Sequence, residues 1–210
     1  KCKSVTPNDN GALSVIEDVL NANNFECERL PFGSGAEKVQ NLFARLGDKI
    51  PHICFAGHSD VVPEGDLKLW EFSPFDGKIS NGKIFGRGAV DMKGSIASYL
   101  SAAIDWIEKN KSFEGSISFL ITGDEEGPAI NGTRKVLDWM EASGQIPDMC
   151  IVGEPTNATK VGDTIKIGRR GSLNGSLTVY GEQGHVAYPH LALNPFPILM
   201  KMIEPLLSGC

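Results

Sequence analysis

The pattern of apolar and polar positions predicts a chain in which short strands alternate with amphipathic helices. Apolar side chains recur at helical spacing in residues 11–23 and again in residues 95–107, which predicts two helices with one buried face each. Continuous apolar runs at residues 53–56, 116–122 and 149–152 have the length and composition of buried strands. Because strands and helices alternate, we expect an α/β fold with a mixed, largely parallel sheet and flanking helices.

Weaker patterns complete the first part of the chain. Residues 25–30 and 39–46 favour two strands separated by a glycine-rich turn. Residues 70–88 favour a loop or short hairpin because they are punctuated by Pro, Gly and Asn-Gly. Residues 133–142 favour a third helix.

The character of the sequence changes toward the C-terminus. Residues 164–167 and 173–180 read as extended and rich in glycine and β-branched residues, and residues 194–207 favour a helix despite their prolines. We therefore expect a first domain over residues 1–170 and the beginning of an α+β domain over residues 171–210. The first seven residues form no complete element and the second domain is too short to be whole, so we also expect the chain to be incomplete.

Composition and charge argue against two classes of binding partner, nucleic acids and membranes. A chain of 210 residues with 41% hydrophobic content can bury a sizeable core. The net charge of -6 and the lack of a long basic run argue against nucleic acid, whose phosphates require clustered Lys and Arg. No segment has the apolar length of a membrane span, and the first residues lack the layout of a secretory signal. We expect neither a nucleic-acid nor a membrane partner.

The cysteines point to a reducing compartment. They are odd in number, widely spaced and never in a Cys-x-x-Cys pair: Cys2, Cys27, Cys54, Cys150 and Cys210. We interpret them as reduced thiols of a cytoplasmic protein, with Cys54 and Cys150 in the core because both lie in apolar strand-like runs. This pattern excludes a sulfur-rich structural zinc site, so a metal would have to use histidine and carboxylates.

Acidic side chains and one histidine occur where predicted strands or loops end. The strand at 53–56 leads to a histidine and an aspartate, the glycine-rich loop before the second helix contains an aspartate, the strand at 116–122 leads to consecutive acids, and the strand at 149–152 leads to a glutamate. These residues are His58, Asp60, Asp91, Glu125, Glu126 and Glu154. Because parallel strands end at one edge of a sheet, we expect them to lie close together.

Each of these residues also has an ordinary structural explanation when taken alone. Asp91 could cap a helix, and the acids after residue 122 could form a solvated turn. Taken together, they suit Zn²⁺ or Mn²⁺, with His58 as a ligand, Asp60 as the group that orients it, and Asp91 able to bridge two ions. One of Glu125 and Glu126 could bind metal while the other acts as general base, which indicates hydrolysis of an amide or ester.

Other readings of the same motifs are weaker. The glycines around Arg87 fit neither a Walker nor a dinucleotide-binding pattern. Ser59 has no base of its own at a suitable spacing, which disfavours a serine hydrolase. On its own, His185 reads as a turn residue.

Several segments together resemble the dinuclear zinc amidohydrolases, a family that includes aminoacylases and acetylornithine deacetylase. The broadly shared segments are Ser4-Val5-Thr6-Pro7, Gly57-His58-Ser59-Asp60-Val61-Val62-Pro63, residues 70–75, residues 86–94 and Glu154-Pro155-Thr156. Residues 122–133, 168–173 and 183–191 are similar more narrowly to the desuccinylases of this family. Two features depart from the family pattern: no second metal-binding histidine is matched, and Leu193 stands where an acidic residue is usual.

The resemblance implies roles for individual residues. It implies that His58, Asp91 and Glu154 hold one zinc, that Asp91 bridges to a second zinc held by Glu126, and that Asp60 orients the histidine. The same resemblance implies Glu125 as the general base.

For residues nearer the C-terminus, the resemblance implies that His185 stabilises the oxyanion in a partner subunit and that Arg169 contacts substrate carboxylates. It also implies two zinc ions, with cobalt or manganese as substitutes, a small-molecule N-acyl substrate and a homodimer. The implied reaction is hydrolysis of N-succinyl-L,L-diaminopimelate. A deacylase for another N-acyl amino acid, a dipeptidase, a non-catalytic metal-binding module and an acidic interaction domain remain alternatives.

Overall fold

The computed structural model describes residues 1–168, 171 and 174–208, and divides the chain into two units. The first spans Lys1–Ile165 and the second Lys166–Cys210. The predicted domain boundary after residue 170 stays a prediction.

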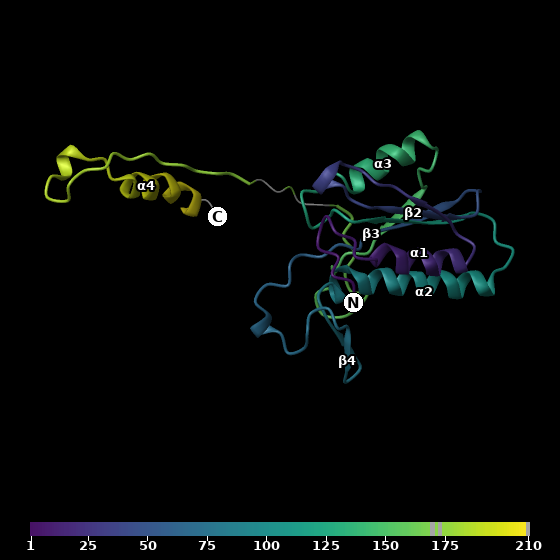
Figure 1. The fold of residues 1–210 in the computed structure, drawn as a ribbon. Helices are drawn as coiled ribbons and strands as arrows, with labels where there is room; N and C mark the ends of the chain where they lie inside the picture. The colour runs from purple at the N-terminus through teal and green to yellow at the C-terminus, as the bar shows by residue number, and fades with distance from the viewer. Residues whose placement is uncertain (169–170, 172–173, 209–210) are drawn as a thin grey trace. The chain divides into compact units, whose positions relative to one another are not determined.

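The first unit is built on a five-stranded sheet in the order β1–β2–β6–β3–β7 (Figure 1). Its strands are β1 (Glu26–Arg29), β2 (Leu42–Leu46), β3 (His52–His58), β6 (Ser116–Thr122) and β7 (Met149–Val152). β2 pairs antiparallel with both β1 and β6, whereas β3 pairs parallel with both β6 and β7. All strands except β2 therefore run in one direction, which confirms the mixed, largely parallel sheet.

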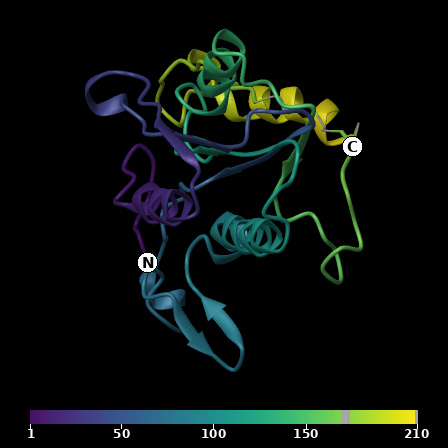
Figure 2. The ribbon, with the colours of Figure 1, turned by 90° about the vertical axis from the view of Figure 1, so that its right-hand side faces the viewer.

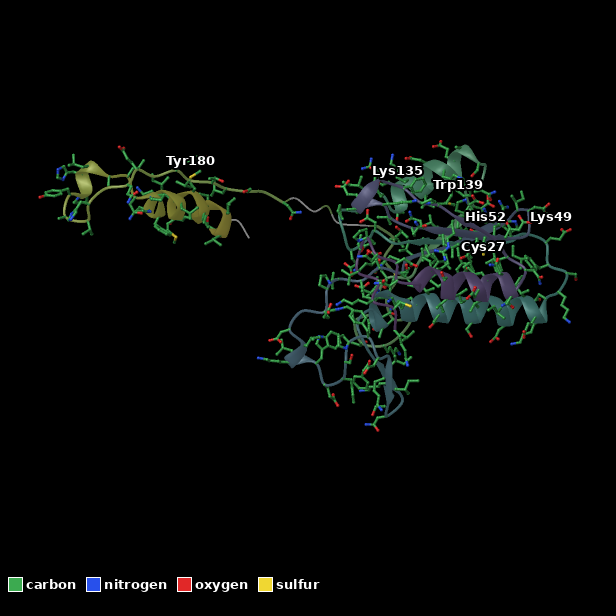
Figure 3. The ribbon with its side chains drawn as sticks, in the orientation of Figure 1. Cys27, Lys49, His52, Lys135, Trp139 and Tyr180 are labelled. Atoms are coloured by element: carbon green, nitrogen blue, oxygen red, sulfur yellow. The ribbon has the colours of Figure 1, made fainter. Side chains whose placement is uncertain are left out.

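Helices cover both faces of this sheet. α1 (Ala12–Ala22) and α2 (Gly94–Lys109) lie side by side on one face, and α3 (Thr133–Ala142) lies on the other (Figures 1 and 2). The α1 and α2 face packs against Phe119 of β6, which is fully buried, while α3 packs against Phe43 of β2. Trp139 of α3, labelled in Figure 3, has its ring centroid 5.3 Å from that of Phe43. The helical periodicities in the sequence are confirmed.

Short elements complete the unit. The segment predicted as a loop or hairpin contains β4 (Lys78–Ser80) and β5 (Lys83–Phe85), joined through Asn81 and Gly82, which both have positive φ. An Asn-Gly pair is favoured there because a two-residue hairpin turn of this kind needs left-handed backbone at both positions. The remaining turns are η1 (Gly35–Glu37), η2 (Leu67–Leu69) and η3 (Ala89–Lys93).

The edge strand β7 departs from the sequence expectation. It pairs with β3 alone within the described residues, and all four of its residues are exposed, with Val152 61% accessible. Cys54 in the neighbouring β3 is buried as predicted, but the prediction of a core position for Cys150 is wrong because no described element covers that part of β7.

The second unit contains η4 (Pro189–Leu191) and α4 (Pro195–Ser208), which confirms the predicted C-terminal helix. Residues 174–180 form no strand, and an isolated antiparallel bridge joins Glu182 to Leu193. Among the helices that the structure describes, none is both long and apolar enough to cross a membrane.

Candidate metal centre

The parallel register of the sheet brings the candidate residues to one edge. His58, the last residue of β3, is the register partner of Thr122, the last residue of β6. β7 runs alongside β3 in the same direction and ends at Val152, beside Ala56. The loops that follow these three strands therefore open on the same side of the sheet, as the sequence predicted.

His58 presents one ring nitrogen to a group of carboxylates. Its side chain is 1% exposed, and its Nδ1 lies 2.9 Å from the backbone carbonyl oxygen of Asp60. A carbonyl only accepts, so Nδ1 donates to it, and Nε2 donates likewise to the Asp91 carboxylate when the ring is protonated. When the ring is neutral, Nδ1 keeps its proton and Nε2 has the lone pair that a metal ion needs. That Nε2 lies 2.9 Å from Asp91 Oδ1, 3.6 Å from Glu154 Oε1 and 4.0 Å from Glu125 Oε2.

The side chains around His58 carry an excess of negative charge, which favours the binding of a cation. Burial lowers the pKa of His58, but the hydrogen bonds and charge of Asp60 and the charge of Glu154 outweigh it and raise the pKa to about 9. Burial and the nearby charge of Asp91 raise the pKa of Glu126. Both raised pKa values mean that protons bind more tightly here, and the surrounding negative charge contributes to both. A divalent cation bound at the same place would neutralise this negative charge.

Asp60 accepts hydrogen bonds through both its backbone carbonyl and its side-chain carboxylate. Its backbone carbonyl makes the hydrogen bond to His58, whereas its carboxylate oxygen is 3.6 Å from Nδ1. The carboxylate instead accepts hydrogen bonds from the Thr6 hydroxyl and from the backbone N–H groups of Glu125 and Glu126. Burial opposes ionisation, but these donors and His58 outweigh it and lower the pKa of Asp60. Asp60 thus links the histidine to the loop after β6.

Asp91 lies in the irregular turn η3 that leads into α2. Its backbone is non-helical, and the N-cap position of α2, which is Lys93, receives no side-chain capping hydrogen bond from the described residues. The alternative that Asp91 is a helix cap therefore does not hold. Its side chain is 50% exposed and faces Nε2 of His58. The following residue, Met92, is fully buried and its sulfur lies 3.3 Å from the backbone nitrogen of His58.

The three consecutive acids after β6 divide into one inward and two outward side chains. Asp124 is buried and accepts hydrogen bonds at 2.9–3.1 Å from three backbone N–H groups farther along the loop, those of Ala129, Ile130 and Asn131. Glu125 is exposed and Glu126 partly buried. The structural role of Asp124 was not found from the sequence, where it appeared as one of three equivalent acids.

Asn41 is a second residue that sequence reasoning missed. It is buried, and its Oδ1 accepts hydrogen bonds from the Thr122 hydroxyl and the Gly123 backbone, while its Nδ2 donates to Leu30 and Asn131. Its polar side chain inside an apolar segment is the signal that could have pointed to it.

Two overlapping sets of ligand atoms lie close enough to hold metal ions. In one set, atoms of His58, Asp91 and Glu126 lie within 4.8 Å of one another, and in the other, atoms of His58, Glu125 and Glu154 do. An imidazole nitrogen with carboxylate oxygens is a donor set that suits zinc or manganese. The residues present therefore fit a metal centre, and the predicted ligands on the first unit converge.

Two predicted site residues belong elsewhere in the chain. Arg169 lies outside the described residues. His185 belongs to the second unit, where its Nδ1 accepts a hydrogen bond at 3.1 Å from the backbone N–H of Ala187 and its ring lies near that of Tyr188. Its role at the metal centre stays a prediction.

Sequence comparison matches the chain to one family profile and to curated relatives that share one name. The profile described as peptidase family M20/M25/M40 matches residues 54–203. A succinyl-diaminopimelate desuccinylase from Rhodospirillum centenum is 57% identical over 210 residues, which is 100% of this chain and 54% of that protein. The enzyme of the same name from Beijerinckia indica is 56% identical, over 99% of this chain and 54% of its own length. The chain thus spans about half the length of the curated relatives it matches.

Solved structures share the fold at lower identity. The M20 family metallo-carboxypeptidase Sso-CP2 from Sulfolobus solfataricus has a TM-score of 0.58 and 23% identity, over 69% of this chain and 32% of that one. Human carnosine dipeptidase 1 also has a TM-score of 0.58, with 22% identity over 67% of this chain and 31% of that one.

Proposed function

The chain belongs to peptidase family M20/M25/M40, and on that premise we propose that it forms the metal-binding part of a succinyl-diaminopimelate desuccinylase. The reaction is hydrolysis of the amide bond of N-succinyl-L,L-diaminopimelate to succinate and L,L-diaminopimelate, a step of diaminopimelate and lysine biosynthesis. The names of the curated relatives, at 51–57% identity, support this substrate.

The observation that carries the proposal is the gathering of carboxylates at one nitrogen of His58. Oxygens of Asp91, Glu154 and Glu125 lie 2.9, 3.6 and 4.0 Å from Nε2, although these carboxylates come from three separate loops and His58 from the end of β3. Uncompensated anions at such distances repel each other, so their grouping favours a site built for cations.

We assign zinc to this site, held by His58, Asp91, Glu126 and Glu154. When bound, zinc ions polarise a substrate carbonyl and lower the pKa of a water molecule. His58 can serve because its Nδ1 is engaged by the Asp60 carbonyl, which leaves Nε2 as the binding nitrogen. Cobalt or manganese suits the same donors.

Glu125 is the general base in this proposal. Its side chain is 41% exposed, so water can reach it, and its carboxylate lies 4.0 Å from Nε2 of His58. From there it takes a proton from the attacking water and delivers it to the amine that leaves when the C–N bond breaks. Asp60 contributes by holding the backbone of Glu125 through its carboxylate.

The test uses the full-length enzyme with Glu125→Gln and, as a matched control, Glu141→Gln on the exposed surface of α3. We expect kcat for succinyl-diaminopimelate to fall about 10²–10⁴-fold in the first variant, with zinc content unchanged, and to stay at the wild-type value in the second. Turnover near wild type in Glu125→Gln would contradict the assigned base. Preferential hydrolysis of acetylornithine or dipeptides by the wild type would contradict the substrate, and bound zinc without any turnover would favour a non-catalytic module.

The proposal extends to the rest of the protein. We assign His185 to the oxyanion in a partner subunit of a homodimer and Arg169 to the substrate carboxylates. The beginning of the dimerisation domain is assigned to residues 171–210. A cytoplasmic location is supported by the reduced state of the four described cysteines, Cys2, Cys27, Cys54 and Cys150. Sedimentation of the full-length protein tests the dimer, and a monomer that turns over fully would contradict the role of His185.

A further inference from the structure

Two cysteines face each other across adjacent strands of the sheet. Cys54 of β3 is the register partner of Cys150 of β7, and the two strands run parallel. Register partners on neighbouring strands point to the same face, and their strands lie about 4.8 Å apart. A disulfide joins Cα atoms that are about 4.4–6.8 Å apart, so this position meets its main geometric requirement without movement of the strands.

The two thiols differ in environment in a way that suits a reactive pair. Cys54 is 1% exposed, whereas Cys150 is exposed. Interaction with the Cys54 side chain lowers the pKa of Cys150 to about 7, while that same interaction and burial raise the pKa of Cys54. An exposed thiolate beside a buried thiol is the arrangement of an attacking and a resolving cysteine.

Two polar side chains, Ser118 and His52, lie near Cys54 in the sheet. Ser118 of β6 is the register partner of Cys54 on the other side, and its hydroxyl lies 2.7 Å from Nε2 of His52. Burial, followed by the charge of Arg45, lowers the pKa of His52, so that ring adds no positive charge near neutral pH. Interaction with Cys54 is what lowers the pKa of Cys150, against the opposing effect of burial.

We propose that Cys54 and Cys150 are a peroxide-sensitive thiol pair that closes into a cross-strand disulfide. The Cys150 thiolate attacks one oxygen of hydrogen peroxide, the O–O bond breaks, and a sulfenic acid and hydroxide form. The Cys54 sulfur then displaces the sulfenic hydroxyl, which leaves with the Cys54 proton as water, so two thiols and one peroxide give one disulfide and two waters. The bond joins the strands that lead to His58 and Glu154.

The experiment measures thiols in the full chain before and after one equivalent of hydrogen peroxide. We expect the wild type to lose two thiols, and non-reducing peptide mass spectrometry to find the peptides of Cys54 and Cys150 linked and lighter by two hydrogens. Cys54→Ala cannot resolve the sulfenic acid, so dimedone should label Cys150 in that variant and not in the wild type. Cys27→Ser is the matched control, because Cys27 lies in β1 (Figure 3) and should leave the linked peptide intact.

Three results would overturn the proposal. The first is a wild type in which both thiols survive the peroxide. The second is a linked peptide that joins Cys150 to Cys2 or to a second chain. The third is a Cys150 that oxidises to the sulfinic acid while Cys54 stays reduced. If Cys54→Ala fails to fold, Cys150→Ser gives the same answer, since its buried Cys54 should then keep its thiol.

Discussion

Replacing Asp60 with asparagine isolates what its negative charge does in the metal centre. The carboxylate oxygen Oδ2 accepts hydrogen bonds from the Thr6 hydroxyl and from the backbone N–H groups of Glu125 and Glu126. Asparagine has the same shape and can keep these three contacts through its carbonyl oxygen, but without charge. The backbone carbonyl that holds His58 is unchanged.

The magnitude follows from the number of donors. A hydrogen bond to a charged group contributes about 1.5–3 kcal/mol and a neutral one about 0.5–1.5 kcal/mol, so each of three contacts weakens by about 1 kcal/mol. Asp60 is 2% exposed, so solvent does not screen this loss. The substitution also removes the desolvation cost of a buried charge, so we expect Asp60→Asn to lower the free energy of unfolding by less than this sum, by about 1–3 kcal/mol. Because the loosened backbone carries Glu125 and Glu126, we also expect zinc affinity to fall about 10–100-fold.

Asp124→Asn is the matched control. Asp124 is equally buried and also accepts three backbone hydrogen bonds, from Ala129, Ile130 and Asn131, but none of these donors belongs to a candidate ligand. Urea denaturation should show a similar loss of stability in both variants, while competition with a chelating dye should show weaker zinc binding only for Asp60→Asn. Equal zinc affinity in the two variants would refute the idea that Asp60 positions the ligand loop.

The free energy of unfolding at acid pH is a second test of the Asp60→Asn variant. The donors around Asp60 lower its pKa in the folded state, so its contribution to stability is fully present above the unfolded pKa of about 3.9 and is lost as pH falls through the folded pKa. Asp60→Asn should therefore flatten the pH dependence of the free energy of unfolding below about pH 4. An unchanged acid slope would contradict the assigned pKa direction.

Three further perturbations test the centre and the packing beneath it. Zinc at about 100 times its Kd should raise the free energy of unfolding by about 2.7 kcal/mol in urea titrations, an effect that a chelator reverses; an unmoved midpoint would contradict a metal centre. Leu13→Ala, at a fully buried position of α1, should cost about 2–5 kcal/mol in thermal melts, whereas Val15→Ala on its exposed face should cost less than about 0.5 kcal/mol; equal costs would mean that the helix is oriented wrongly. Gly153→Ala should cost about 1–3 kcal/mol by circular dichroism, because a Cβ there would lie 2.5 Å from Phe55 Cζ, while Gly175→Ala meets open space and should be neutral; a neutral Gly153→Ala would show that the site relaxes freely.

Much of the fold could be predicted because local periodicity and tertiary burial agree. β6 is buried along its whole length and reads as a continuous apolar run, and α2 shows one apolar stripe that meets the sheet. β7 reads equally apolar, yet it is exposed. Its own sequence carries no information about which element lies beside it, so the burial of Cys150 could not be predicted from residues 149–152 alone.

The candidate site was predictable in position and less so in detail. Parallel strands end at a common edge, so His58, Glu125 and Glu154 could be grouped from their places after apolar runs. Which of three consecutive acids turns inward depends on backbone dihedral angles that periodicity does not encode, and this is why the role of Asp124 was missed. For the same reason, the sequence could not decide whether Asp91 caps a helix. The non-helical backbone of η3 shows that it does not cap α2.

Packing beneath the centre explains how separate loops hold their ligands at fixed separations. Gly57 directly precedes His58, and a Cβ on it would lie 2.7 Å from the methyl carbon of Met92. Gly153 directly precedes Glu154, and a Cβ there would lie 2.8 Å from that same methyl carbon. Met92 itself directly follows Asp91 and is fully buried. One methionine side chain therefore fills the space left by two glycines, and it connects three candidate ligands through their immediate neighbours. Close packing resists even small changes in such a contact, so the apolar core, and not only the polar network of Asp60, sets the geometry of the centre.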